Sequence, residues 1–266
     1  MLKRRLIPVL FLKDGWMVRS ESFKIHQFIG NPILHVERMV QWEVDELIVI
    51  NISSSETDKF QHDRHDYKDQ CVTDLYTFIS RIAKECRIPL TFGGKLRTFE
   101  QVQRVLHSGA DKVSINTLLF ENPMIVSDCI KSFGSQAIVG SVDYKIIDGK
   151  PFVFRDFGNV NTKIPLFDWL KRIEKLGVGE ILLNSVEKDG KANGYDIETI
   201  SKASDTLKIP VIACGGAGLQ KHFLNCFLDT RAGGVAAGNI FHFTENAYPR
   251  AKEYLAKYNV NIRKRL

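Results

Sequence analysis

Short apolar runs alternate with longer amphipathic stretches along the whole chain. The runs have the length of buried strands, and the stretches between them repeat apolar residues at helical spacing. The predicted strands are Leu6–Leu12, Leu47–Ile52, Ile88–Phe92, Lys112–Ile115, Ala137–Val142, Glu180–Leu183, Ile209–Ala213 and Gly234–Ala237. This alternation predicts repeated βα units around a parallel sheet.

Two stretches show how the helices are predicted. From Val72 to Ala83 the apolar residues recur on one helical face. Asn31-Pro32 marks a helix start, because Asn caps a first turn and Pro fits its first position. Eight strands, each followed by a helix, in 266 residues without a linker favour one α/β domain, a (β/α)8 TIM barrel, over an open doubly wound sheet.

The chain also repeats itself at about half its length. "IPLTFGGKLRTFEQVQRVLHSGADKVSIN" (88–116) is similar to "IPVIACGGAGLQKHFLNCFLDTRAGGVAAGN" (209–239), with a Gly-Gly turn and a terminal Asn in both. A weaker echo aligns "VLFLK" (9–13) with "SVDYK" (141–145) and sets Phe11 opposite Asp143. The repeats predict a barrel of two halves, about 1–130 and 131–266.

Composition narrows the class of protein. With 44% hydrophobic residues and no apolar stretch of the roughly 18 residues that a membrane span needs, we expect a cytoplasmic protein that does not bind membranes. The net charge of +6 is spread through the chain without basic and aromatic clusters. It therefore favours phosphorylated small molecules or an acidic partner over nucleic acid.

Neither cysteine nor histidine spacing predicts a metal or cofactor site. The five cysteines form no C-x-x-C pair and are expected to be reduced thiols. His62 and His65 stand in a charged loop without a third ligand at a familiar spacing, which favours a solvated loop. We therefore expect no metal and no cofactor.

Glycine turns after two strands are candidate phosphate sites. Gly93-Gly94 follows the third strand and Gly215-Gly216 the seventh, each just before a helix. Glycine there lets backbone N–H groups and a helix N-terminus approach an anion, although it also serves simply to permit a tight turn. Two copies half a barrel apart favour a long ligand with a phosphate at each end.

Charged residues mark both ends of the predicted barrel. Asp143, at the end of the fifth strand, is expected to act as a general acid or base at the mouth, unless it only caps the surface. Asp189 offers a second carboxylate or shapes its own loop. At the opposite end we expect a ring of ion pairs that closes the barrel floor. Its members are Arg5, Glu46, Lys112 and Glu180.

With these features and five further motifs, the chain from Leu2 to about Arg263 resembles the HisF family, the cyclase subunits of imidazole glycerol phosphate synthase. The motifs are "GADKVSINT", "FGSQAIVGSVDYK", "GEILLNSVEKDGKANGYD", "IACGGAG" and "NIFHF". The resemblance implies a TIM barrel with two phosphate sites and a HisH-like glutaminase on its floor. Ammonia would pass through the barrel core to the mouth, where two Asp side chains act as acid and base on a phosphorylated ribulosyl substrate.

The resemblance also assigns roles to single residues. Asp143 matches one catalytic Asp, and Asp111 matches a residue that docks the glutaminase. The predicted floor ring matches an ammonia gate. One phosphate site matches Gly94, Asn116 and Thr117, and the other matches Gly190, Gly215, Gly216 and Asn239. The segment from Arg19 to Gly30 matches a mobile loop over the mouth.

Departures from the family pattern gather at the predicted mouth. Phe11 replaces the second catalytic Asp, and a benzyl group neither donates nor accepts a proton. Lys95 replaces the third Gly of a Gly-Gly-Gly turn. The other replaced positions are Asn51 and Glu187, both usually Asp, and Asn184, usually Thr.

Three functions follow as hypotheses. The first is a HisF-like paralogue that delivers ammonia, with a separate amidotransferase as third protein, for the amidination of a bacterial surface-polysaccharide sugar. The second is a histidine-pathway cyclase in which Asp14 or Asp189 substitutes for the missing acid. The third is a non-catalytic scaffold that only activates its glutaminase.

Overall fold

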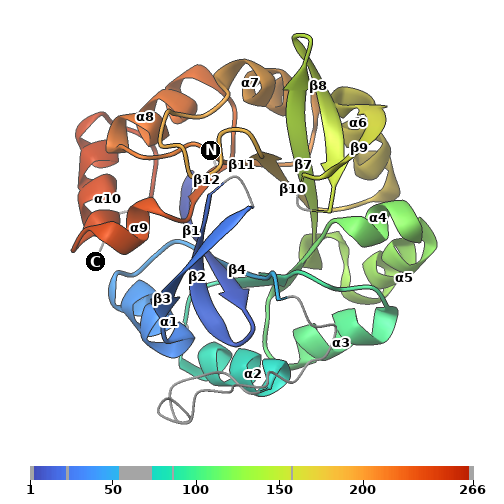
Figure 1. Cartoon of the computed structure of the whole chain (residues 1–266), viewed down its shortest axis with the longest axis horizontal. Helices are drawn as coiled ribbons and strands as arrows, with labels where there is room; N and C mark the ends of the chain where they lie inside the picture. The colour runs from blue at the N-terminus through green and yellow to red at the C-terminus, as the bar shows by residue number, and fades with distance from the viewer. Residues whose placement is uncertain (1–2, 22–23, 54–73, 86, 157, 264–266) are drawn as a thin grey trace.

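The computed structural model describes residues 3–21, 24–53, 74–85, 87–156 and 158–263, and shows a closed barrel inside a ring of helices (Figure 1). Neighbouring barrel strands pair in parallel, and the last pairs with the first. In order around the barrel they are β1 (Arg5–Lys13), β4 (Leu47–Asn51), β5 (Leu90–Gly93), β6 (Lys112–Ile115), β7 (Ile138–Ile147), β10 (Glu180–Ser185), β11 (Val211–Cys214) and β12 (Gly234–Ala237). The closure confirms the predicted TIM barrel and its eight strands, and excludes the open sheet.

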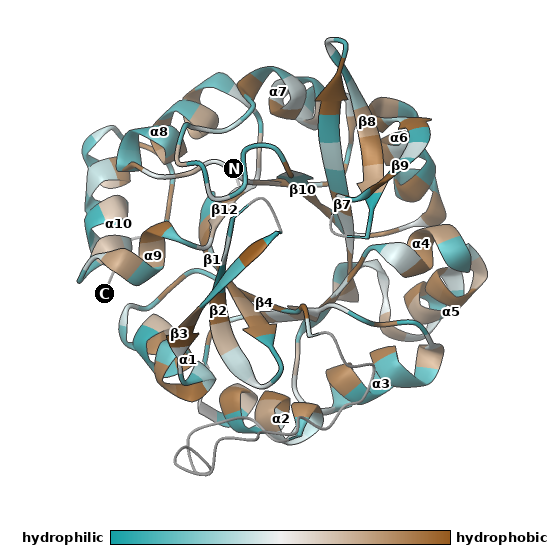
Figure 2. Ribbon diagram, viewed as in Figure 1, coloured by the Kyte–Doolittle hydropathy of each residue, from teal (hydrophilic) through white to brown (hydrophobic). Residues whose placement is uncertain are grey.

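The helices follow the strands and cover the outside of the barrel; Figure 2 shows both hydrophilic and hydrophobic residues along them. Asn31 caps α1 as predicted, because its side chain accepts a hydrogen bond from the Ile33 N–H at 2.8 Å. Some predicted features lie outside the described residues, namely Val72 of the second helical face, Cys71, Cys86, His62 and His65. The helices are α1 (Pro32–Gln41), α2 (Leu75–Glu85), α3 (Phe99–His107), α4 (Thr117–Glu121), α5 (Pro123–Phe133), α6 (Leu166–Leu176), α7 (Ile197–Thr206), α8 (Gln220–Asp229), α9 (Ile240–Phe243) and α10 (Ala247–Lys257).

Each half-barrel carries an antiparallel insertion after its first strand. β1 continues into β2 (Trp16–Glu21) and β3 (Ile25–Gly30), and β7 continues into β8 (Lys150–Arg155) and β9 (Val160–Pro165). A helix still follows each of these two barrel strands, but only after two further strands that were not predicted from the sequence. The predicted loop from Arg19 to Gly30 is largely a pair of strands, and Asp143 lies within β7 rather than at its end.

Side chains of the barrel strands alternate between two apolar cores, as the two-residue period of a strand requires. Outward residues such as Leu6, Leu10 and Leu47 pack against the helices. The second cluster lies inside the barrel and consists of Ile7, Val9, Phe11, Val18, Ile48, Ile52, Val139, Leu182, Ile212 and Ala236. The interior between floor and mouth is therefore mainly apolar.

The described residues test part of the predictions on cysteines, metal sites and membrane spans. Cys129, Cys214 and Cys226 are free thiols there. In the same residues no three His, Cys, Asp or Glu side chains gather in a way that would hold a metal ion. No helix in the described part of the chain combines the length and apolar character needed to cross a membrane.

Candidate functional site

A pocket opens at the carboxyl ends of the barrel strands. It brings together Phe11 and Asp143, which the sequence predicts at the mouth, and one of the two predicted phosphate sites. Asp143 and Asp156 are the carboxylates in its described lining. The lining includes Val9, Phe11, Ile50, Asn51, Gly94, Lys95, Arg97, Ser114, Asn116, Thr117, Ser141, Asp143, Asp156, Leu182, Asn184 and Cys214.

Asp143 is held by two side-chain amides. Asn184 Nδ2 donates to its Oδ1 and Asn116 Nδ2 to its Oδ2, each at 2.8 Å. Burial raises the pKa of this carboxyl to about 6, although the two hydrogen bonds counteract part of that rise. A carboxylate whose pKa is close to neutrality is suited to take up and release a proton at physiological pH.

Phe11 is part of the apolar interior, as its place in the sequence predicts. It is 7% exposed, packs in the cluster that contains Val9 and Leu182, and lines the same pocket as Asp143. The half-barrel echo is visible in the strands, since Ile7 and Val139 lie in the same interior cluster four residues before Phe11 and Asp143. At the two positions where the family pattern has two acids, this pocket therefore has Asp143 and the aromatic ring of Phe11.

The turn after β5 explains why Gly94 is needed. Its φ is +92°, and a Cβ there would lie 2.0 Å from the backbone oxygen of Asn51, so glycine is required because the turn packs closely against the end of β4. Lys95 also has a positive φ, +60°, which L-residues adopt at a cost. The predicted third glycine position is thus occupied by a strained lysine that lines the pocket.

The corresponding turn follows β11, and the first insertion contacts the loops on either side of it, after β10 and after β12. Gly215 has a φ of +91°, and a Cβ there would lie 2.6 Å from the Ser185 backbone oxygen. Asn239 donates its side-chain amide to the Ser20 carbonyl at 2.7 Å, and Ser20 Oγ donates to Asp189 at 3.1 Å. β2 therefore lies against the loops that carry the second predicted phosphate site, and Gly190 packs closely on Ser20 and Glu21.

The amides of Asn116 and Asn239 are bonded within the protein. Both residues follow strands that end at the mouth, and both are predicted phosphate-site residues. Asn116 has turned its amide to Asp143, and Asn239 to Ser20. In the conformation described, these two side-chain amides are therefore engaged in bonds within the protein.

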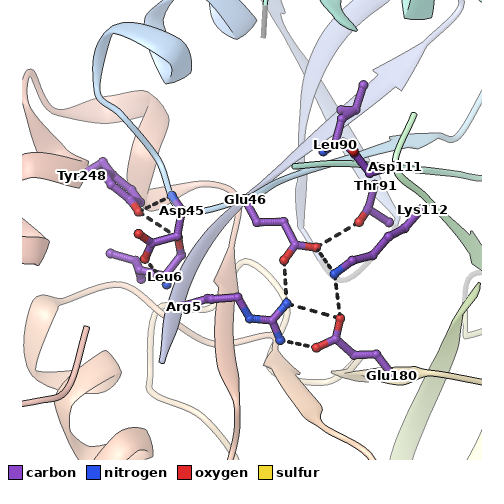
Figure 3. A network of polar contacts seen from close by, with 10 residues as sticks. All are labelled: Arg5, Leu6, Asp45, Glu46, Leu90, Thr91, Asp111, Lys112, Glu180 and Tyr248. Atoms are coloured by element: carbon purple, nitrogen blue, oxygen red, sulfur yellow. Dashed lines mark hydrogen bonds and ion pairs between the residues drawn. The ribbon is translucent and has the colours of Figure 1, made fainter. Parts of the chain in front are cut away.

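The predicted ring of charges closes the floor of the barrel (Figure 3). Arg5 binds Glu46 at 2.6 Å and also Glu180, while Lys112 Nζ lies 2.9 Å from Glu46 and 3.1 Å from Glu180. Thr91 adds a hydrogen bond to Glu46 at 3.0 Å. Burial acts to lower the pKa of Arg5, but its bonds and charge interactions with Glu180 and Glu46 outweigh this and raise it. All four members of the ring are therefore paired.

Two aspartates stand beside this ring (Figure 3). Asp111 immediately precedes Lys112, is exposed, and accepts a hydrogen bond from the Leu90 N–H at 2.8 Å. Asp45 precedes Glu46 but is buried, with Lys252 Nζ at 2.7 Å from one oxygen. The predicted docking residue, Asp111, is thus a surface carboxylate at the floor, whereas Asp45 is structural.

Sequence reasoning missed several contacts of the site. It noted Asn184 only as a departure and did not connect Asn184 or Asn116 with Asp143. It also missed Asp156, which follows β8 and reaches the pocket. Period-two alternation would have found the two Asn residues, because each stands two positions after an inward residue, Ser114 or Leu182.

Comparisons with known proteins agree with the geometry. The sequence model of the family described as "Histidine biosynthesis protein" matches residues 5–247. The imidazole glycerol phosphate synthase subunit HisF of Hydrogenobaculum sp. (strain Y04AAS1) is 37% identical over 99% of this chain and 100% of its own length. The HisF subunit of Natranaerobius thermophilus is 37% identical with the same coverage, and that of Thermotoga sp. (strain RQ2) is 36% identical over 98% of its length.

Proposed function

Because this chain belongs to the HisF family, we propose that it is a synthase subunit that receives ammonia from a HisH-like glutaminase at its floor and delivers it to an acceptor at its mouth. The floor ring and Asp111 support the first half of this proposal, because delivery needs an entry to the barrel and a partner-binding residue beside it. The mouth pocket supports the second half, since it holds a buried carboxylate that can move a proton.

The apolar interior suits transport of neutral ammonia. Ile7, Ile48, Val139 and Ile212 lie between the ring and the pocket layer and offer no charged group. Ammonia crosses such surroundings far more easily than ammonium, because burial of an unpaired charge is costly. The ring must open for passage, and Lys112 is its most weakly held member, at 2.9 and 3.1 Å from its two carboxylates.

The acceptor in this proposal is a sugar nucleotide or a sugar intermediate, amidinated for a bacterial surface polysaccharide with a third protein, an amidotransferase. One observation carries the proposal: Phe11 stands opposite Asp143 in the same pocket, while the floor ring is complete. In this proposal the acid at the position of Phe11 is lost, whereas the floor ring is retained. Asp143 remains to accept the proton that the nitrogen loses as it adds to an amide carbonyl of the acceptor, whose C–O bond then breaks so that the oxygen leaves as water.

Phosphate groups on the acceptor would bind at the turns after β5 and β11. Gly94 and Thr117 line the pocket beside Lys95 and Arg97, whose charges attract an anion. Gly215 and Gly216 form the corresponding turn half a barrel away. This arrangement suits a long ligand with an anionic group at each end.

An assay with ammonium salt in place of glutamine tests the acceptor directly. The purified chain and the ribulosyl substrate of the family should give no cyclised product, and Phe11→Asp should restore part of the activity. Turnover close to that of ordinary cyclases would contradict the proposal. Phe11→Leu is the matched control, because it changes the ring without supplying a carboxyl.

A histidine-pathway cyclase is the second candidate, and the HisF relatives support it about equally. The structure changes which residue would be the substitute acid. Asp14 and Asp189 are absent from the described pocket lining, whereas Asp156 is part of it. If the ammonium assay gives product that disappears in Asp156→Asn, this second function replaces the first.

Partner binding has its own test. We expect Asp111→Arg to abolish co-elution with a HisH-like glutaminase on a sizing column, because the exposed carboxylate lies at the floor. If Lys112→Met leaves glutamine-dependent product formation unchanged in the complete complex, ammonia does not pass through this barrel. The chain would then serve as a scaffold that activates its glutaminase.

A further inference from the structure

Three buried oxygens without a partner lie at one place in the barrel. They are Ser114 Oγ, Asn116 Oδ1 and Asn184 Oδ1. Ser114 and Asn184 are 3% and 4% exposed, and all three residues line the mouth pocket with Asp143. The other buried side-chain atoms without a partner in the described residues are nitrogens of His26, Arg38, Trp169 and His242. Among the described residues, buried side-chain oxygens without a hydrogen-bond partner therefore occur in this pocket alone.

The orientation of the two amides follows from the charge of Asp143. An ionised carboxylate only accepts hydrogen bonds, so both Asn side chains must turn their NH2 groups toward it. The carbonyl oxygens of the two amides then have no hydrogen-bond partner. The strands are adjacent, with β7 between β6 and β10, and Asn184 is paired in register with Asp143. Asn116, Asn184 and Asp143 thus offer oxygens that only accept, and the Ser114 hydroxyl beside them can accept as well as donate.

The hydrogen-bonding chemistry of these oxygens determines which ligands can bind beside them. Amide carbonyls and a carboxylate bind groups that donate, and a buried carboxylate favours a positive charge. The pocket's cations, Lys95 and Arg97, follow β5, whereas the four oxygen-bearing residues belong to β6, β7 and β10 or follow them directly. Phe11 and Leu182 supply apolar walls, and an aromatic ring tolerates a nearby cation.

We propose that Ser114, Asn116, Asn184 and Asp143 form a subsite for a small nitrogen cation that carries several N–H bonds. Two sources of this chemistry rest on the proposed function: ammonium, the protonated form of the delivered ammonia, and the amidinium group of an amidinated product. In either case the ligand donates to the unpartnered carbonyls and lies against the carboxylate.

Titration of the isolated chain tests the subsite without a glutaminase or an acceptor. Ammonium chloride and acetamidinium chloride are added to 15N-labelled protein, and the side-chain amide signals of Asn116 and Asn184 are followed. At least one of the two salts should give a saturable shift at pH 7.5. Potassium chloride, tetramethylammonium chloride and neutral acetamide match size or charge without the full set of donors, and they should not.

Variants locate the response. Asn184→Leu should weaken binding at least tenfold when the Asn116 signal is followed. Ser114→Ala, a smaller change that keeps the strand intact, should weaken it several-fold. Asn225→Leu, on the exposed surface of α8, should bind like the parent chain. Equal responses to potassium and ammonium, or unchanged binding in both pocket variants, would show that only water or ionic strength acts here and would overturn the subsite.

The two sources are separated by the same data. A response to ammonium alone assigns the subsite to incoming nitrogen, and a stronger response to acetamidinium assigns it to the product group. If the titrations show no subsite, the proposal that the chain delivers ammonia still stands. Conversely, an intact subsite in a chain that fails to use glutamine-derived ammonia would refute the proposed function alone.

Discussion

The floor and the mouth of this barrel use polar residues in opposite ways. At the floor, two carboxylates and two cations pair in a closed ring, and Thr91 bonds to Glu46. At the mouth, three buried oxygens lack a partner, a lysine has a left-handed backbone, and an aromatic ring faces a buried acid. Satisfied polar groups stabilise a fold, whereas unsatisfied and strained ones are typical of binding sites. The difference agrees with the proposal that the mouth, and not the floor, binds the acceptor.

The largest expected effect is at the mouth. Asp143→Asn should lower ammonia-dependent turnover by about 10²–10⁴-fold, because it removes the group that accepts a proton from nitrogen. Turnover is measured with excess ammonium salt, so that transport through the floor does not contribute. Asp128→Asn, on the surface of α5, is the control. Turnover that survives in Asp143→Asn would contradict the assignment of Asp143.

The same substitution should make the protein more stable at neutral pH. Burial raises the pKa of Asp143 from 3.8 to about 6, so the folded state holds this proton more tightly than the unfolded state. The stabilisation is complete below about pH 4 and is lost as pH rises through about 6. Asp143→Asn should therefore gain about 1–3 kcal/mol of unfolding free energy at pH 7.5 and nothing near pH 4. Denaturant unfolding at both pH values checks this.

The floor should respond in the opposite sense. Glu46→Gln leaves two cations facing one carboxylate, and breaking a buried pair in this way costs about 3–5 kcal/mol of unfolding free energy. Glu121→Gln removes a half-exposed partner of Arg97 and should cost about 0–1 kcal/mol. Denaturant unfolding of both variants measures the contrast. If Glu46→Gln is as mild as Glu121→Gln, the ring is a mobile gate rather than a structural closure.

The sequence made the floor easier to predict than the mouth. Arg5, Glu46, Lys112 and Glu180 stand at or beside strand starts, so the period of the strands alone places them in one layer. The barrel and its eight strands follow from the same period. The contacts of Asp143 depend on which way two amides turn, and the position of β2 depends on long-range bonds such as Asn239 to Ser20. Periodicity carries no information on either.

The pH dependence of turnover gives a smaller effect. With a pKa of about 6, Asp143 is mostly ionised at pH 7 and about nine-tenths protonated at pH 5, so turnover should fall about tenfold between them. The other titratable or charged groups of the pocket are Asp156, Lys95, Arg97 and Cys214, and burial raises the pKa of the Cys214 thiol so that it stays neutral.

A variant identifies the group that titrates. Asn184→Leu removes one of the hydrogen bonds that lower the pKa of Asp143, so the midpoint of the profile should move to higher pH. The change is read from the pH at half-maximal turnover, with ammonium salt as nitrogen source. A midpoint that stays fixed would assign the titration to Asp156 or to the acceptor.

The smallest expected effect concerns the strained turn at the mouth. Lys95 and Lys163 both have a φ of +60°, but Lys163 lies on β9, outside the described pocket lining. Replacement of either by Gly should relieve backbone strain and raise the unfolding free energy by up to about 1 kcal/mol, less the entropy that glycine loses on folding. Equal gains at the two positions would mean that the backbone alone fixes the positive φ of Lys95 and that its side chain adds no stabilising contact. A smaller gain, or a loss, at Lys95 would measure the free energy of the contacts that its side chain makes at the mouth. The strained backbone at Lys95 would then be offset by contacts in the pocket.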